Sequence, residues 1–335
     1  MKNLLIICSI FLIFSCSKED NSTQPTIQEP AKVTNIYIGG SQKINGKEKA
    51  TIWKNGVAQL LATDADNSSR VNSVYVSGND VYAVGFQVFP TVIRAALWKN
   101  GDYITLEYNL SEAYSIQVFK DQIYIVGQFD NNATLWVNPN GNFGDSKLSS
   151  VYPSIAKSVF LSNDGSTITG VSIVGLVGTS AWTYLNSNNF LFTNTSVAES
   201  VFVRGADVFV VINNEFLDIK TASLQKNGVL QNTISSNTVM YSVHGDDQNI
   251  YAVGAINPNT TNSKATIWEN YIPKQLSQLY SQANSVIVSD KNVYVAGYEY
   301  DSNTAHYKAT LWINGTVQTI STEDCQVKSV FVTVK

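Results

Sequence analysis

Hydrophobic residues along most of this chain fall in short runs separated by turn residues such as glycine and asparagine. No stretch places apolar residues at the spacing of a helix, so the pattern predicts short β-strands throughout. A serine followed by a β-branched residue marks one such strand. It recurs at intervals of 42 to 44 residues, as Ser73, Ser115, Ser158, Ser200, Ser242, Ser285 and Ser329.

Three further strands follow within each repeat. A Tyr-x-x-Gly pattern begins about nine residues after the serine, as in Tyr82 with Gly85. In the repeat of Ser158, threonine replaces the tyrosine and only the glycine, Gly170, remains. An Asn-Gly turn, typical of a tight hairpin, ends the third strand in four repeats. That strand carries all the tryptophans, with Gln225 in the one gap: Trp53, Trp98, Trp136, Trp182, Trp268 and Trp312.

Four strands in about 43 residues is the size of a β-propeller blade. The first repeat, residues 35–63, lacks its first strand, and residues 328–332 form a first strand with nothing after it. The C-terminal strand can therefore pair into the N-terminal blade and leave no open edge. The sequence predicts an all-β, seven-bladed propeller over residues 33–335. A β-helix or a row of independent hairpins is the alternative.

The first residues have the pattern of an export signal. Lys2 precedes an apolar run over residues 4–14, which is shorter than the ~20 residues of a spanning helix. Residues 1–15 therefore read as a signal peptide. The sequence Ile13-Phe14-Ser15-Cys16 resembles the lipobox of bacterial lipoproteins, and this resemblance implies that Cys16 is acylated. An ordinary signal peptide with a chance cysteine is the alternative.

Residues 16–32 read as the lipidated cysteine and a flexible tether, since they are polar and contain two prolines. The segment Ser17-Lys18-Glu19-Asp20 resembles the surface-export signal of some Gram-negative lipoproteins. These resemblances imply an outer-membrane protein that faces the cell exterior, with the periplasmic face as the alternative. The membrane would then be a partner only through the lipid on Cys16.

A second resemblance lies in the fourth blade. Residues 163–170, Asn-Asp-Gly-Ser-Thr-Ile-Thr-Gly, lead on to Ala181-Trp182 and look like the repeat of the HAF family of extracellular proteins. The resemblance implies a secreted, propeller-like array. It supplies no catalytic residue that can be carried over to this chain.

Composition and charge exclude one class of binding partner. Only 14% of residues are charged and the net charge is −4, which argues against nucleic acid because phosphate binding needs a basic face. Cys8 lies in the signal peptide and Cys16 in the lipobox-like motif, so Cys325 is left as one free thiol and no disulfide framework is possible. We expect a monomer.

The sequence offers no catalytic or metal-binding constellation. His244, in a predicted inner strand, and His306, in a predicted loop, lie in different repeats. The acidic segment 64–68 starts like a calcium loop but has Ser69 and Tyr75 where that loop needs glycine and glutamate. We therefore expect no cofactor and no metal. The tryptophans, one per blade at one strand position, indicate core packing and not a sugar-binding set.

Strand order places a candidate site. In four antiparallel strands, the second-to-third loops share one face with the blade-to-blade connections, and we call this the variable face. Loops of variable length on a regular scaffold commonly carry binding residues. The residue before each repeat serine also varies and should ring the channel mouth on that face: Asn72, Tyr114, Lys157, Glu199, Tyr241, Asn284 and Lys328.

This ring of aromatic, amide and charged side chains suits a glycan or a partner protein. The sequence thus favours a surface-exposed binding or scaffold module. A solvated rim without a ligand is one alternative. An enzyme is the other, a polysaccharide lyase or hydrolase with its site on the variable face.

Overall fold

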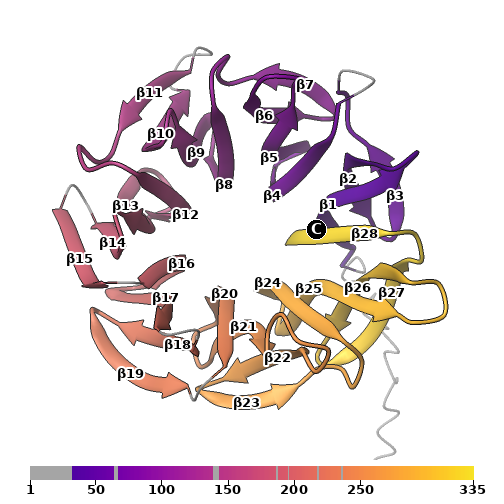
Figure 1. Cartoon of the computed structure of the whole chain (residues 1–335). Helices are drawn as coiled ribbons and strands as arrows, with labels where there is room; N and C mark the ends of the chain where they lie inside the picture. The colour runs from indigo at the N-terminus through magenta and orange to yellow at the C-terminus, as the bar shows by residue number, and fades with distance from the viewer. Residues whose placement is uncertain are drawn as a thin grey trace, which may run out of the picture. The chain divides into compact units, whose positions relative to one another are not determined.

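Seven antiparallel sheets of four strands each account for the 28 β-strands of the protein. The computed structural model describes residues 32–63, 67–138, 143–185, 188–194, 196–216, 219–234 and 237–335. Val33–Lys335 is one compact unit, and Figure 1 shows its sheets set as blades around a central space. The predicted seven-bladed propeller is confirmed. Within the described ranges, no helix has the length and apolarity needed to cross a membrane.

Each blade is named by its order around the ring, and its strands are given from the inside outward. Blades 1 to 3 are β28 (Cys325–Val334), β1 (Thr34–Ile44), β2 (Lys47–Lys54), β3 (Val57–Leu60); β4 (Ser69–Ser77), β5 (Asp80–Val88), β6 (Ile93–Lys99), β7 (Asp102–Thr105); β8 (Ser111–Phe119), β9 (Gln122–Phe129), β10 (Asn132–Asn138), β11 (Gly144–Lys147). Blades 4 and 5 are β12 (Ser154–Asn163), β13 (Ile168–Val177), β14 (Ser180–Leu185), β15 (Asn188–Asn194); β16 (Ser196–Arg204), β17 (Asp207–Phe216), β18 (Ile219–Lys226), β19 (Val229–Ile234). Blades 6 and 7 are β20 (Thr238–Gly245), β21 (Ile250–Ile256), β22 (Lys264–Glu269), β23 (Ile272–Gln275); β24 (Ser281–Ser289), β25 (Asn292–Asp301), β26 (His306–Ile313), β27 (Thr316–Ser321).

The C-terminal strand closes the ring, as predicted. β28 pairs antiparallel with β1 from Thr34↔Val334 to Gln42↔Cys325, and Figure 1 shows the two ends of the propeller side by side. Beyond the ladder, the backbones of Val33 and Lys335 exchange hydrogen bonds of 2.8 and 3.0 Å. Closure pairs the inner edge of β1 with β28, so the propeller has no unfinished blade.

Apolar side chains are buried between neighbouring blades. Seven buried clusters, one for each contact between blades, hold the core of the described residues. Six of them contain one tryptophan each, and every tryptophan is at most 2% exposed. The cluster between blades 4 and 5 has none, because Gln225 stands in that position. The tryptophans are therefore core residues, as their spacing predicts.

Most blades have a second buried serine, four residues before the repeat serine, and Cys325 takes that position in β28. Ser69 begins β4, and its hydroxyl accepts a hydrogen bond of 2.9 Å from the backbone N–H of Ala50 in the preceding blade. Serines at the same place in four other blades accept in the same way from Ala95, Ala133, Ala181 and Ala265. Cys325 occupies this place in β28 and is 1% exposed. Burial raises the pKa of its thiol to about 11, so the thiol stays protonated.

The turns between third and fourth strands are structural. Asn55 and Asn100 adopt positive φ, and their side-chain oxygens accept from the backbone N–H of Ile36 and Val81 at 2.8 and 2.9 Å. Blade 6 lacks the Asn-Gly pair but makes the same kind of turn with Asn270 and Tyr271, at φ 46° and 72°. In five blades, among the described residues, the asparagine side chain thus ties this turn to the second strand of its own blade.

Candidate functional site

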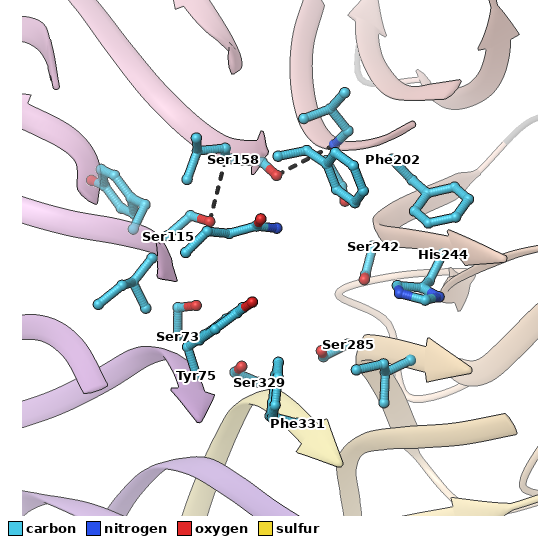
Figure 2. Close-up of a pocket in the computed structure, with 18 of the residues that line it drawn as sticks. Ser73, Tyr75, Ser115, Ser158, Phe202, Ser242, His244, Ser285, Ser329 and Phe331 are labelled. Carbon is cyan, nitrogen blue, oxygen red and sulfur yellow. Dashed lines mark hydrogen bonds between the residues drawn. The ribbon is translucent and has the colours of Figure 1, made fainter. Parts of the chain in front are cut away.

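The seven innermost strands enclose a channel with a cavity of about 470 Å³. Its lining repeats in layers: a residue that varies among the blades, then the repeat serine, then a mostly aromatic residue two positions on. Figure 2 shows six of the serines around the channel, with Tyr75, Phe202, His244 and Phe331 among the residues of the third layer. The serine and the residue two positions on share a side because alternate residues of a strand face the same way.

The residue before each serine sits in a β-bulge. Pairing of β4 with β5 skips Asn72, between Val71↔Gly85 and Ser73↔Val84, and all six other innermost strands shift register at the same place. A bulge inserts one extra residue and re-aims side chains. As a result, both the extra residue and the serine after it line the channel.

The serines hold the innermost strands to one another. The Ser329 hydroxyl of blade 1 accepts from the backbone N–H of Val74 in blade 2, at 3.1 Å. Five more such bonds of 3.1–3.3 Å join other neighbouring blades, with Ser115, Ser158, Ser200, Ser242 and Ser285 as acceptors. Serine recurs at this position because it links blades, which is a structural role.

The repeat glycine faces the bulge. A Cβ at Gly85 would lie 1.9 Å from the carbonyl oxygen of Arg70, so only glycine fits there. In blade 4 the glycine with this role is Gly175, opposite Ala156, and the alignment on Gly170 was wrong. The cause is the longer turn between β12 and β13, where the Asp164 carboxylate accepts from the backbone N–H groups of Ser166 and Thr167.

The seven bulge residues meet around one cavity of about 380 Å³ at the channel end on the variable face, which we call the mouth. Sequence reasoning identified all of them: Asn72, Tyr114, Lys157, Glu199, Tyr241, Asn284 and Lys328. It missed three other lining residues, Arg70, Glu112 and Gln282. Each of these stands three residues before a repeat serine, on the same side of the strand as the bulge residue, and that spacing was the available signal.

A hydrogen-bonded group forms one side of the mouth. The Glu112 carboxylate accepts from the side chain of Asn72 at 2.9 Å and from the hydroxyl of Tyr114 at 3.0 Å. The ammonium of Lys157 lies 4.5 Å from the centre of the Tyr114 ring, within cation–π range. These contacts fix the Tyr114 side chain, and burial raises its pKa well above the usual range.

The opposite side is held by a chain of amides. The Tyr298 hydroxyl donates to the Gln282 oxygen (3.2 Å), Gln282 donates to Asn284 (2.6 Å), and Asn284 donates to the carbonyl of Val327 (2.6 Å). The last bond spans from blade 7 to blade 1. Both sides of the mouth are therefore preorganised.

Burial shifts the pKa values of Glu199, Lys328 and Tyr241 in the mouth. Burial raises the pKa of Glu199, against the opposing effects of Lys157, of a hydrogen bond from Asn213 and of Lys328. Burial lowers the pKa of Lys328 to about 8, helped by the positive charge of Arg70. Tyr241 is raised to a pKa of about 12 by burial and by Glu199. The carboxylate form of Glu199 and the ammonium form of Lys328 are therefore costly until a ligand of the opposite charge compensates them.

The far layer of the channel holds His244, as predicted. Its Nδ1 accepts from the backbone N–H of Val288 at 3.3 Å, and burial lowers its pKa to about 4, so the ring is neutral. His306 was expected in a loop but begins β26, where it pairs with Asp301. In the described ranges, no group of three or more His, Cys, Asp or Glu side chains is placed to hold a metal ion.

Some predictions fall outside the described residues. These are the signal peptide, the acylation of Cys16, the tether up to residue 31, and the acidic residues 64–66.

Comparison with solved structures supports the fold. The β-propeller domain of the trilobed protease from Pyrococcus furiosus is 13% identical, with a TM-score of 0.50, and the match covers 77% of this chain and 85% of that one. A puromycin-hydrolysing peptidase from Mycobacterium tuberculosis is 12% identical, with a TM-score of 0.48 over 76% of this chain and 46% of that one. A sialidase from Trypanosoma rangeli, in complex with sialic acid, is 10% identical, with a TM-score of 0.44 over 88% and 56%.

Likeness at such identities shows the fold alone, because propellers serve many unrelated functions. No protein-family model and no curated protein sequence matches the chain. The similarity of residues 163–170 to HAF repeats therefore stays a resemblance.

Proposed function

We propose that this protein is a binding module that holds the acidic end of a glycan in the mouth of its channel. One observation carries the proposal: the seven bulge residues meet around one cavity, and they vary among the blades although the two positions that follow them hardly change. The position after it is always serine and the next is always valine or isoleucine, whereas the bulge holds asparagine, tyrosine, lysine or glutamate. The fold constrains the neighbours but leaves the bulge side chain free to serve a ligand.

Charge and size favour an acidic chain end. The mouth is lined by three cations, Arg70, Lys157 and Lys328, and two carboxylates, Glu112 and Glu199. Arg70 is paired with Glu48 at 3.7 Å, which leaves Lys157 and Lys328 as the cations for a ligand. Glu112 is already engaged by Asn72 and Tyr114, and burial disfavours the charged form of Glu199. A recessed cavity of about 380 Å³ is within the range of small-ligand sites, and it admits the end of a chain more readily than a flat protein surface.

Removing one cation or one ring from the mouth should weaken binding. We expect Lys328→Met to lower the affinity for an acidic oligosaccharide by about tenfold or more, since a hydrogen bond to a charged group is worth ~1.5–3 kcal/mol. Tyr241→Ala should act similarly through lost ring contact. The full chain in detergent is screened on an array of acidic oligosaccharides, neutral oligosaccharides and peptides, and the hits are titrated.

Val57→Ala is the control, because Val57 is 72% exposed and follows a turn on the opposite face. The melting temperature should not fall in Lys328→Met, since the change removes a half-buried charge. Undiminished affinity in both mouth variants, or binding of peptides in place of acidic glycans, contradicts the proposal.

A lyase acting at the same mouth is the second candidate, favoured by the lowered pKa of Lys328 and the raised pKa of Glu199 in the lining of one cavity. A neutral amine is a base that can take the proton next to a sugar carboxylate, and a protonated carboxyl can supply one to the leaving oxygen. Incubation with uronate-containing polysaccharides distinguishes the two. A lyase generates unsaturated uronates with new ultraviolet absorbance, whereas a binding module leaves the polymer intact.

We further propose that lipid on Cys16 anchors the propeller to the outer membrane, facing the exterior. The support is the apolar run over residues 4–14 and the lipobox-like residues 13–16. One acyl chain alone binds membranes only marginally, so stable anchoring implies more than one chain on this residue.

Cys16→Ser should release the protein from the membrane. After Triton X-114 partitioning, we expect the original chain, with lipid on Cys16, in the detergent phase and the Cys16→Ser variant in the aqueous phase. Cys325→Ser is the matched control and should stay with the detergent, because Cys325 is buried in the propeller. A Cys16→Ser variant that still partitions into detergent contradicts the anchor.

A further inference from the structure

A second pocket lies on the variable face where blades 6 and 7 meet. It has a volume of about 480 Å³ and shares no lining residue with the mouth. We propose that this tyrosine pocket binds a neutral sugar ring. Its lining is Asn259, Thr260, Thr261, Tyr280, Tyr300 and Tyr307.

The tyrosines are gathered by strand geometry. Tyr298 and Tyr300 are two residues apart on β25 and so face the same side, and Tyr307 on β26 is paired directly with Tyr300. Tyr280, in the connection before β24, is fixed by its carbonyl, which accepts from the backbone N–H of Tyr300 at 2.8 Å. Four phenol rings therefore converge from three segments.

The rings are held against one another. Tyr280 lies 6.1–6.4 Å, between ring centres, from each of the other three. Tyr307 lies 5.0 Å from Tyr298 and 5.3 Å from Tyr300. All four are half-buried, so each ring is fixed yet still partly open. A ligand that stacks on such rings loses little affinity to side-chain ordering, because the side chains are already ordered.

The opposite wall is a fixed loop with available polar groups. Thr260 holds the β21–β22 loop through its hydroxyl, which donates to the carbonyl of Asn257 at 2.9 Å and accepts from the backbone of Asn262 at 3.2 Å. The side chains of Asn259 and Thr261 are exposed, and no hydrogen bond to them is found among the described residues. They can therefore donate to and accept from sugar hydroxyls.

The uncharged lining of the pocket favours a neutral ligand. Its six lining residues are asparagine, threonine and tyrosine, so the lining holds no Asp, Glu, Lys, Arg or His. Three nearby charged side chains have partners of their own: Lys308 is paired with Asp301, Asp324 is paired with Lys43, and Lys264 donates to the carbonyl of Gln278. The face of an aromatic ring is electron-rich and attracts the slightly positive C–H groups on the face of a sugar ring. Stacking rings, free amide and hydroxyl groups, and no net charge fit a neutral sugar.

The test uses the full chain in detergent and immobilised neutral oligosaccharides of glucose, xylose and mannose, with a polyproline peptide beside them. We expect at least one oligosaccharide to bind and the peptide not to bind. Tyr300→Ala should weaken binding by about tenfold, whereas Tyr300→Phe, which keeps the ring, should stay within about threefold. Thr261→Ala, in the exposed loop, tests the polar wall without disturbing the rings and should weaken binding several-fold.

Two controls separate this pocket from other surfaces. Tyr108→Ala removes a tyrosine that is 73% exposed elsewhere on the variable face and should change nothing. Lys328→Met should impair acidic glycans at the mouth and leave the neutral sugars unaffected. The inference is overturned if no neutral oligosaccharide binds, if the polyproline peptide binds in their place, or if Tyr300→Ala and Thr261→Ala both keep full affinity.

Discussion

Deletion of residues 326–335 is expected to prevent the propeller from folding. The deleted segment supplies nearly all of β28 and the buried side chains of Val327, Val330 and Val332. Burying each valine is worth ~1.5–3 kcal/mol, so these three alone approach the ~5–15 kcal/mol by which a typical domain is stable. The deletion also exposes β1 and the innermost strands of blades 2 and 7. Size-exclusion chromatography should show aggregate, and circular dichroism should show no cooperative melting.

A deletion of equal length at residues 21–30 is the control, because it precedes the propeller and should leave melting unchanged. A 326–335 deletion that stays monomeric and melts like the full chain contradicts closure by β28.

Replacing a tryptophan by alanine should be the most costly single change. Trp98 and Trp312 are fully buried between blades, and truncating such a side chain typically costs ~3–5 kcal/mol. We expect Trp98→Ala and Trp312→Ala each to lower the free energy of unfolding in urea by about that amount. Gln225→Ala changes the same position of blade 5, where no tryptophan packs, and should cost clearly less. A tryptophan variant that keeps full stability but loses ligand binding would place the indole in a site.

The spacing of the repeat serine could be predicted to mark a strand, but the role of the serine could not be predicted from the sequence. The spacing predicted seven innermost strands and hence the propeller. The serine recurs because its hydroxyl accepts a hydrogen bond from the next blade, as Ser329 does from Val74 and Ser158 from Val201. These partners are far apart in the sequence, so the sequence alone does not show the bond. The bulge was missed although it leaves a signal in the sequence. The skipped residue shifts the alternation of buried positions by one, as at Asn72 in β4, whereas only the variability of this residue had drawn attention to it.

Two other outcomes follow from local geometry. Gly170 seemed to match the repeat because glycine and spacing alone were compared, and a longer β12–β13 turn moves the role to Gly175. The tyrosine pocket was overlooked because β25 and β26 extend into a predicted loop, where Tyr300 pairs with Tyr307, while Tyr280 comes from another segment. The variable loops drew attention to this face, but their composition gave no account of which side chains meet.

The pH dependence of acidic-glycan binding tests the mouth most directly. The pKa of Lys328 is about 8, so its side chain is positively charged below that pH and loses its charge above it, while a sugar carboxylate stays ionised. For an acidic oligosaccharide titrated by calorimetry between about pH 6.5 and about pH 9.5, we predict affinity to fall about tenfold or more as pH rises through 8, and Lys328→Met to bind weakly with no such fall. Affinity that is constant over this range, or a Lys328→Met variant with the affinity and pH profile of the original protein, would contradict ligand binding at the mouth.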